Sequence, residues 1–262
     1  MNKLQAVLTK NKEAGKKSFI GYFTAGDPSI DAFERTLLSL EKAGCDVIEL
    51  GVPFSDPLAD GPTIQAAGQR AIEGGINIEK VFDLVAKHRH QVKAPLVFLI
   101  YFNTIYRYGM EAFAKRCEET GIDGLIIPDL PLEEQDEFLP YIDQSKIAMI
   151  PFATPTSKGR LNKVLANGSG FVYTVSSMGV TGRNSEFYAD IEKYVEEVRE
   201  AAKDIPVAIG FGISTASDVK RISKIADAVI VGSAIVTKIH ETNADPKAVE
   251  AFIKELKAGL EE

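Results

Sequence analysis

The sequence predicts an α/β protein of the (β/α)8 barrel class, formed as a single domain over residues 1–262. Eight short apolar segments rich in β-branched and aromatic residues alternate with amphipathic segments along the chain. Strand–helix alternation repeated this often implies parallel strands joined by right-handed crossovers. A closed barrel commonly occupies about 250 residues, which fits this chain better than the structural alternative, an open doubly wound sheet.

The eight apolar segments have the length and composition of buried strands. They lie at residues 19–24, 47–50, 96–102, 125–128, 147–152, 171–175, 207–210 and 228–231. The intervening segments carry apolar residues at helical spacing. Helices are therefore predicted at residues 32–43, 64–73, 78–90, 110–119, 132–142, 190–202 and 247–260. Residues 1–14 are polar and helix-prone, which predicts an extra N-terminal helix, and no Pro/Ser/Gly-rich linker divides the chain.

Composition and charge limit the classes of function. Hydrophobic residues make up 45% of the chain, so it can form a sizeable core without a metal or a disulfide. The net charge of −7 argues against nucleic-acid and anionic-membrane binding. Cys45 and Cys117 have no paired spacing and are expected to be reduced core thiols, with a catalytic thiol as the alternative. Without a signal-like or membrane-spanning apolar segment, the protein is expected to be cytoplasmic.

Two connections are longer than a minimal barrel requires. The second predicted strand is followed by a proline-rich loop at residues 51–63, and the sixth by a polar, glycine-containing segment at residues 176–185. The second of these is expected to be a mobile flap. Both follow the C-terminal ends of strands, where barrel enzymes have their active sites.

Glu49 and Asp60 are the candidate acid–base residues. Alternation places Glu49 on the same face as Val47, and on the inner face its carboxyl group would be desolvated and its pKa raised. The alternative for Glu49 is a structural ion pair, and the alternative for Asp60 is a helix cap before a Gly-Pro-Thr sequence. Asp56 and Asp129 precede proline-containing turns and are interpreted as turn or cap residues.

Two small-residue loops occupy the positions at which barrels often bind phosphate. Residues 210–214 follow the seventh predicted strand, and residues 232–234 follow the eighth. Glycine lets backbone N–H groups at a helix N-terminus approach phosphate oxygens. Apolar and aromatic side chains near the strand ends would suit a flat apolar portion of the same substrate. These side chains are Tyr22, Leu99, Tyr101, Phe152 and Tyr173.

Two kinds of chemistry lack the residues they need. The three histidines do not form a metal-binding pattern, which disfavours a metal-dependent epimerase. No lysine lies within a predicted strand or at its C-terminal end, so a Schiff-base aldolase has no nucleophile. Cleavage of a carbon–carbon bond would have to proceed by acid–base catalysis.

Residues 49–65, with the sequence ELGVPFSDPLADGPTIQ, closely resemble the signature of the tryptophan synthase alpha subunit family. The resemblance extends along the whole chain, through the segments at residues 26–28, 179–182, 210–214 and 232–236. It implies a lyase of tryptophan biosynthesis that cleaves indole-3-glycerol phosphate to indole and glyceraldehyde 3-phosphate. It also implies that no metal or cofactor is bound in this chain.

The resemblance also implies residue roles. Glu49 would be the main acid–base group, and Asp60 would hold the indole N–H and stabilise the positive charge that develops on the ring. Thr181 would be the flap residue that meets Asp60 on closure. Tyr22, Leu99, Tyr101, Phe152 and Tyr173 would line the substrate site. Gly182, Phe211, Gly212, Gly232 and Ser233 would bind its phosphate.

The family's partner is a pyridoxal-phosphate-dependent beta subunit, in an alpha–beta–beta–alpha heterotetramer that passes indole through a tunnel. The proline-rich loop and residues 103–108 correspond to family contact positions. Tyr22 replaces the phenylalanine of the enterobacterial pattern, and residues 177–178 and 183–184 also depart from it.

Two other functions stay open: an allosteric ligand-binding subunit with little catalysis, and another phosphate-binding barrel isomerase or synthase. Indoleglycerol-phosphate synthase, however, would be expected to have a catalytic lysine at a strand end.

Overall fold

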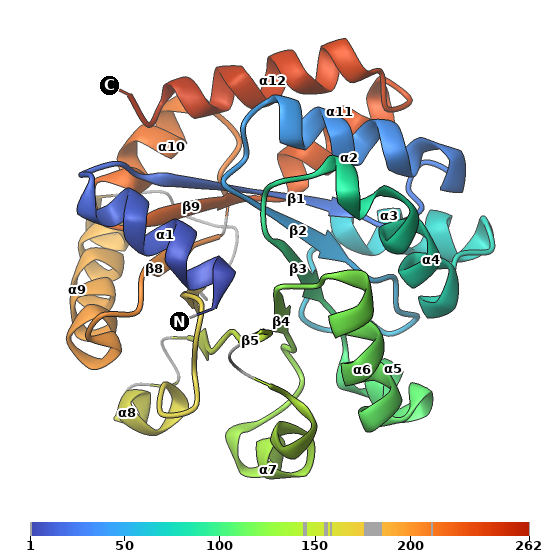
Figure 1. Ribbon diagram of the computed structural model, residues 1–262. Helices are drawn as coiled ribbons and strands as arrows, with labels where there is room; N and C mark the ends of the chain where they lie inside the picture. The colour runs from blue at the N-terminus through green and yellow to red at the C-terminus, as the bar shows by residue number, and fades with distance from the viewer. Residues whose placement is uncertain are drawn as a thin grey trace.

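The computed structural model describes residues 2–143, 146–154, 157, 159–175, 185–210 and 212–261, with the backbone alone for residues 185–190. Its strands form one parallel sheet in the order β5-β4-β3-β2-β1-β9-β8-β7-β6 (Figure 1). The strands are β1 (Ser18–Thr24), β2 (Val47–Gly51), β3 (Leu96–Leu99), β4 (Gly124–Ile126), β5 (Ala148–Met149), β6 (Phe152–Ala153), β7 (Val172–Thr174), β8 (Val207–Ile209) and β9 (Ala228–Val231).

The sheet closes through residues 148–153, which form hydrogen bonds to both neighbouring strands. On one side, Ile150 N donates to Leu125 O of β4 at 3.0 Å. On the other, Tyr173 N of β7 donates to Pro151 O at 2.9 Å. The single strand predicted at residues 147–152 is therefore seen as two, because Pro151 has no N–H to donate at the middle of the segment. The predicted (β/α)8 barrel is confirmed.

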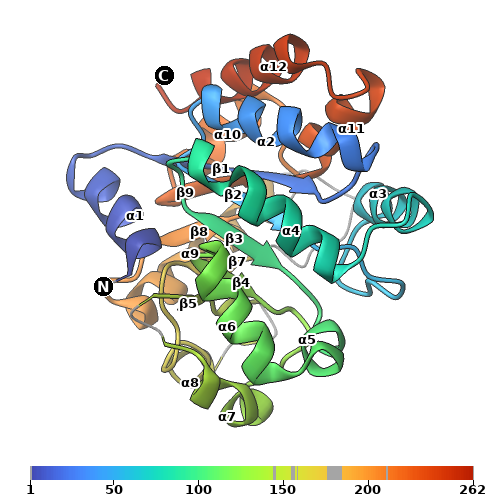
Figure 2. The same ribbon diagram turned by 45° about the vertical axis from the view of Figure 1, so that its right-hand side comes forward.

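The α-helices cover the outside of the barrel, except for α1, which lies across one of its ends (Figure 2). They are α1 (Lys3–Glu13), α2 (Phe33–Lys42), α3 (Pro62–Glu73), α4 (Ile78–His88), α5 (Phe102–Tyr108), α6 (Met110–Thr120), α7 (Gln135–Phe138), α8 (Leu161–Val164), α9 (Ser185–Ala202), α10 (Ala216–Ser223), α11 (Ser233–Glu241) and α12 (Pro246–Ala258). Short 3-10 helices lie at η1 (Ile30–Ala32), η2 (Arg89–Gln91), η3 (Leu132–Glu134) and η4 (Leu139–Tyr141).

Besides the strand at residues 147–152, three predicted elements differ from the observed ones. The strand predicted to reach residue 102 ends at Leu99, because Phe102 begins α5 and its N–H is bound by the Asp129 carboxylate at 2.7 Å. The helix predicted at residues 132–142 consists of η3, α7 and η4, and Pro140 lies in the first turn of η4. The helix predicted from residue 190 begins at Ser185. Helices α5, α8, α10 and α11 were not predicted from the sequence.

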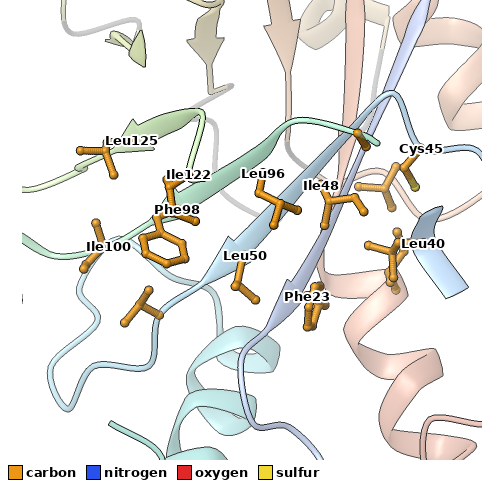
Figure 3. Close-up of a cluster of buried hydrophobic side chains, with 14 of the residues drawn as sticks. Phe23, Leu40, Cys45, Ile48, Leu50, Leu96, Phe98, Ile100, Ile122 and Leu125 are labelled. Carbon is orange, nitrogen blue, oxygen red and sulfur yellow. The ribbon is translucent and has the colours of Figure 1, made fainter. Parts of the chain in front are cut away.

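The two faces of each strand pack into two separate cores. Ile48 and Leu50 of β2 belong to the outer core between the strands and the helices, part of which is shown in Figure 3. Val47 belongs to the inner core, together with Ile20 of β1 and Val97 of β3. Side chains alternate along a strand, so the side chain between Ile48 and Leu50 points into the barrel.

Helix α1 closes the barrel at the end where the strands begin. In both ribbon views it lies on the side opposite the arrowheads of β1 and β2 (Figures 1 and 2). Leu4 and Leu8 are fully buried in the inner core. A Cβ atom at Gly124 or Gly170 would approach the Leu4 side chain to 3.0 or 2.8 Å, so glycine at these positions makes room for it.

Three aspartates hold strand starts together at this same end. Each directly precedes a strand, and one carboxylate oxygen accepts the N–H of a residue near the start of the neighbouring strand. The pairs are Asp46–Phe19, Asp123–Leu96 and Asp227–Val207, with distances of 2.8, 2.9 and 3.0 Å. Lys3 and Lys12 of α1 form ion pairs with Asp123 and Asp227 at 3.7 and 3.3 Å. The polar side of α1 is therefore tied to the strands that its apolar side plugs.

Truncation of the plug should lower stability. We expect Leu4→Ala to reduce the free energy of unfolding by about 2–5 kcal/mol, because it removes buried contacts and leaves a cavity. Leu58→Ala is the matched control, since Leu58 is 94% exposed, and should change the value by no more than about 0.5 kcal/mol. Urea denaturation measures both. Equal effects would show that α1 is not part of the cooperative core.

Candidate active site

Glu49 lies inside the barrel near the C-terminal end of β2. Its backbone is in register with Tyr22 of β1 and Val97 of β3, and the residue is 1% exposed. Among the described residues, Oε2 has no hydrogen-bond partner and no Lys or Arg forms an ion pair with this carboxylate. Burial, reinforced by the charge of Asp60, raises the pKa of Glu49 to about 8. The alternative of a structural ion pair therefore has no support in the described part of the chain.

Asp60 lies on the loop between β2 and α3. Its main-chain oxygen accepts a hydrogen bond from Gln65 Nε2 at 2.9 Å. Gly61, not Asp60, is the N-cap of α3, and no side chain caps this helix, so the capping interpretation of Asp60 was wrong. Burial raises the pKa of Asp60 to about 6, while a hydrogen bond with Tyr101 acts in the opposite direction.

Tyr101 fastens the loop that carries Asp60. Its hydroxyl oxygen accepts the N–H of Ala59 at 3.0 Å, and its ring stacks on Phe54 with centroids 5.0 Å apart. Tyr101 therefore contacts this loop at two places: at Phe54 near its beginning, and at Ala59 next to Asp60. This role was not predicted, because it joins residues 42 positions apart in the sequence.

Two more tyrosines point toward the acid pair, and each hydroxyl lies over a glycine. A Cβ atom at Gly51 would lie 2.0 Å from the Tyr22 hydroxyl, and one at Gly210 would lie 2.7 Å from the Tyr173 hydroxyl. Burial raises the pKa of both tyrosines well above the ordinary value, and the charges of Glu49 and Asp60 add to the effect. Both hydroxyls are therefore protonated at neutral pH and can donate hydrogen bonds.

The remaining predicted lining residues lie close to these tyrosines. Phe152 stacks on Tyr173 with ring centroids 4.9 Å apart. Leu99, at the end of β3, packs against the inner core and also against the small cluster that contains Tyr22. The structure therefore brings the predicted apolar wall to the same end of the barrel as Glu49.

The start of α11 has the geometry of a phosphate site. Gly232 is its N-cap without a side-chain cap, and Ser233 is its first residue. The first N–H groups of a helix have no intrahelical partner and attract anions. A Cβ atom at Gly232 would lie 3.5 Å from the Tyr22 ring, which places this helix start beside the acid pair. Gly212, after β8, has a φ of +64°, a conformation that favours glycine.

Some predicted residues lie outside the described part of the chain. They are Thr181, Gly182 and Phe211, and with them residues 176–184 of the predicted flap. Asp129 lies in a turn, as predicted, but it does not cap the helix that follows, whose N-cap is Pro131. Its carboxylate instead accepts the N–H of Phe102, the first residue of α5. Asp56 accepts a hydrogen bond from Ser55 Oγ at 2.5 Å, as expected of a turn residue.

The described residues contain no group of three or more His, Cys, Asp and Glu that could hold a metal ion. Cys45 and Cys117 are buried and free, and burial raises the pKa of both thiols. This agrees with the predicted core thiols. No helix in the same ranges is long and apolar enough to cross a membrane.

Comparison with known proteins decides the family. A family model described as tryptophan synthase alpha chain matches residues 8–262. The chain belongs to the tryptophan synthase alpha chain family. A tryptophan synthase alpha chain from Alkaliphilus metalliredigens is 46% identical over 97% of this chain and 93% of its own length. One from Thermoanaerobacter sp. is 45% identical over 99% of this chain and all of its own.

Solved structures of this family share the fold. Tryptophan synthase subunit alpha from Legionella pneumophila superposes with a TM-score of 0.90 at 32% identity, covering 100% of this chain and 99% of that one. A chain of Mycobacterium tuberculosis tryptophan synthase superposes with a TM-score of 0.89 at 35% identity, covering 99% and 98%. The resemblance to the tryptophan synthase alpha family inferred from residues 49–65 is thereby confirmed.

Burial of Glu49 predicts a stability that falls as the pH rises. The carboxyl group binds its proton more tightly in the folded chain, where its pKa is about 8, than in the unfolded chain. Its contribution is therefore complete below the unfolded pKa and is lost as the pH rises through the folded one. Relative to Glu49→Gln, the unfolding free energy should fall by about 1.4 kcal/mol for each pH unit crossed between the two pKa values. Urea denaturation at several pH values measures this, and parallel curves for the two proteins would contradict it.

Proposed function

We propose that this chain is the lyase subunit that cleaves indole-3-glycerol phosphate to indole and D-glyceraldehyde 3-phosphate in tryptophan biosynthesis. The observation that carries the proposal is the pair of electrostatically coupled carboxyl groups, Glu49 and Asp60, at the C-terminal end of β2. We further infer that residues 1–262 act as one domain and that the protein works in the cytoplasm.

The two carboxyl groups differ in proton affinity, which supports different roles. With a pKa of about 8, Glu49 is mostly protonated at neutral pH and can give a proton to indole C3. Its carboxylate can then take the proton of the glycerol hydroxyl group next to the bond that breaks. The electrons of that carbon–carbon bond return to the indole ring, and glyceraldehyde 3-phosphate leaves with a new carbonyl group.

Asp60 supplies negative charge rather than a proton. With a pKa of about 6 it is mostly ionised at neutral pH. An ionised carboxylate can accept the indole N–H and stabilise the positive charge that forms on the ring when C3 is protonated. Because two carboxyl groups at one site have different environments, one can act as the acid and the other as the electrostatic stabiliser.

The phosphate end of the substrate would lie at the start of α11. Gly232 and Ser233 offer backbone N–H groups there, and Gly212 lies on the adjoining loop after β8. Tyr22, Leu99, Phe152 and Tyr173 would line the path between this end and Glu49. We carry over Thr181, Gly182 and Phe211 from the family resemblance as further binding residues, with Thr181 meeting Asp60.

We also propose a beta subunit as the partner, in an alpha2-beta2 heterotetramer in which pyridoxal phosphate is bound by the beta subunit. Leu58 is 94% exposed on the loop after β2, and Tyr106 is 63% exposed on α5, directly after β3. Both follow C-terminal strand ends, so these exposed apolar side chains lie at the same end of the barrel as Glu49 and Asp60. Large exposed apolar side chains are typical of protein–protein interfaces.

The direct test is the formation of indole. The purified chain is mixed with indole-3-glycerol phosphate, with and without a beta subunit. The chain contains no Trp, so the absorption of the indole ring can be followed with little protein background. Indole should form under at least one condition. Its absence under both would exclude the lyase function.

Glu49→Gln should nearly abolish turnover. The amide cannot transfer the proton, and loss of a general acid–base group lowers kcat by about 10²–10⁴-fold. Binding of glycerol 3-phosphate should stay close to that of the natural chain, because the proposed phosphate site is on α11. Exposed Glu111→Gln is the matched control and should keep full activity. Parallel loss of turnover and phosphate binding would indicate a structural role for Glu49.

Tyr106→Asp should weaken the beta-subunit interaction. A charge in the centre of an apolar contact typically raises the dissociation constant about tenfold or more. Tyr141→Asp is the control, since Tyr141 is also exposed but lies in η4, in the connection that leads into β5 at the opposite end of the barrel. Titration calorimetry with the beta subunit measures both. Equal binding by the two variants would place the interface elsewhere.

A further inference from the structure

The side chains of Tyr22 and Thr24 form a buried hydroxyl pair inside the barrel. Both residues lie on the inward face of β1, two positions apart, and are 5% and 3% exposed. Their oxygens are 3.2 Å apart, which is a hydrogen bond in which either hydroxyl can be the donor. Two hydroxyl groups own two protons, and one hydrogen bond uses one of them. The other proton is available to an acceptor beside the pair.

The position of the Tyr22 ring determines where this proton can go. The ring packs against the start of α11, 3.5 Å from where a Cβ atom of Gly232 would lie. Its hydroxyl reaches across to β2, over Gly51, where only a glycine leaves room for it. The chain continues from Gly51 into the loop that carries Asp60. The hydroxyl therefore lies at the base of that loop.

Tyrosines from both sides of β2 act on Asp60 or respond to its charge. In the sheet, β2 lies between β1 and β3. Tyr101, two residues after β3, hydrogen-bonds the Asp60 carboxylate and holds Ala59. Tyr22 lies on β1. After burial, the charge of Asp60 contributes most to the raised pKa of its hydroxyl, more than the charge of Glu49 does.

We propose that Tyr22 is a positioning residue for Asp60: Thr24 donates its hydroxyl proton to Tyr22, and Tyr22 donates its own to the Asp60 carboxylate. The carboxylate is then held between Tyr22 and Tyr101, ready to face the indole N–H. The inference rests on the proposed lyase function. The ring of Tyr22 would line the substrate site, and its hydroxyl would hold the Asp60 carboxylate in place.

Four variants test the relay. Tyr22→Phe keeps the ring against Gly232 and removes only the hydroxyl, so kcat should fall about tenfold, the value of one hydrogen bond to a charged group. KM and the dissociation constant of glycerol 3-phosphate should change less than twofold. Thr24→Val should lower kcat similarly, and Thr24→Ser, which keeps a hydroxyl, should restore it. The double variant Tyr22→Phe/Thr24→Val should be no slower than Tyr22→Phe, because both changes break the same chain of hydrogen bonds.

Several outcomes would overturn the inference. One is a kcat of Tyr22→Phe equal to that of the unmodified chain. Another is a loss of kcat in the double variant equal to the product of the losses in the two single variants. A rise in KM matching the fall in kcat would indicate a packing role. Where the natural chain forms indole and Tyr22→Phe forms it equally fast, the lyase function stands and only the relay fails.

A second readout does not depend on activity. The groups that act on the Asp60 carboxylate, or respond to its charge, are Glu49, Tyr22, Tyr101 and Tyr173. Removal of a donor from an ionised carboxylate raises its pKa. Carbon-13 NMR titration of Asp60 should therefore show a higher pKa in Tyr22→Phe than in Tyr173→Phe, the matched control. Equal values would overturn the relay even in a chain that forms no indole.

Discussion

Closure of a parallel sheet onto itself is the constraint on which the rest of this molecule depends. Once residues 148–153 bond to strands on both sides, every strand has an inner and an outer face. The outer face of β2 is satisfied by helices, and its inner face is surrounded by other strands. Glu49 has no way to reach bulk water from there except through the end of the barrel. Its raised pKa follows first from this burial, and the charge of Asp60 adds to it.

The loop after β2 keeps the second carboxyl group, that of Asp60, ionised. A carboxylate that must stay ionised needs hydrogen-bond donors and some access to water. Asp60 is placed on a loop rather than a strand, less deeply buried than Glu49, and Tyr101 offsets part of the effect of its burial. The rigid strand and the pinned loop therefore give two identical functional groups different proton affinities across a short distance.

Most of the strands and the acid pair were predictable because they depend on local patterns. The alternation of residues 47–50 placed Glu49 correctly, and the signature around it identified the family. Contacts between distant segments carried no such signal: the Asp129 carboxylate accepts the N–H of Phe102 at the start of α5, and the Tyr101 hydroxyl accepts that of Ala59. Helix α10 was missed although its capping box, Thr215 with Asp218, can be recognised from spacing alone. Thr24 was inside the strand predicted at residues 19–24, and its place two positions after Tyr22 puts both side chains on one face.

Helix α1, which closes the other end of the barrel, constrains the order in which the chain can fold. Helix α1 is made long before the partners of its lysines, because Asp123 and Asp227 come more than a hundred and more than two hundred residues later. Lys17, just beyond α1, likewise bonds Ala226 O. Helix α1 can therefore make these contacts only after most of the barrel has been made. Until then, Leu4 and Leu8 are exposed and can be bound by chaperones. Closure of the barrel by α1 is therefore a late step of folding.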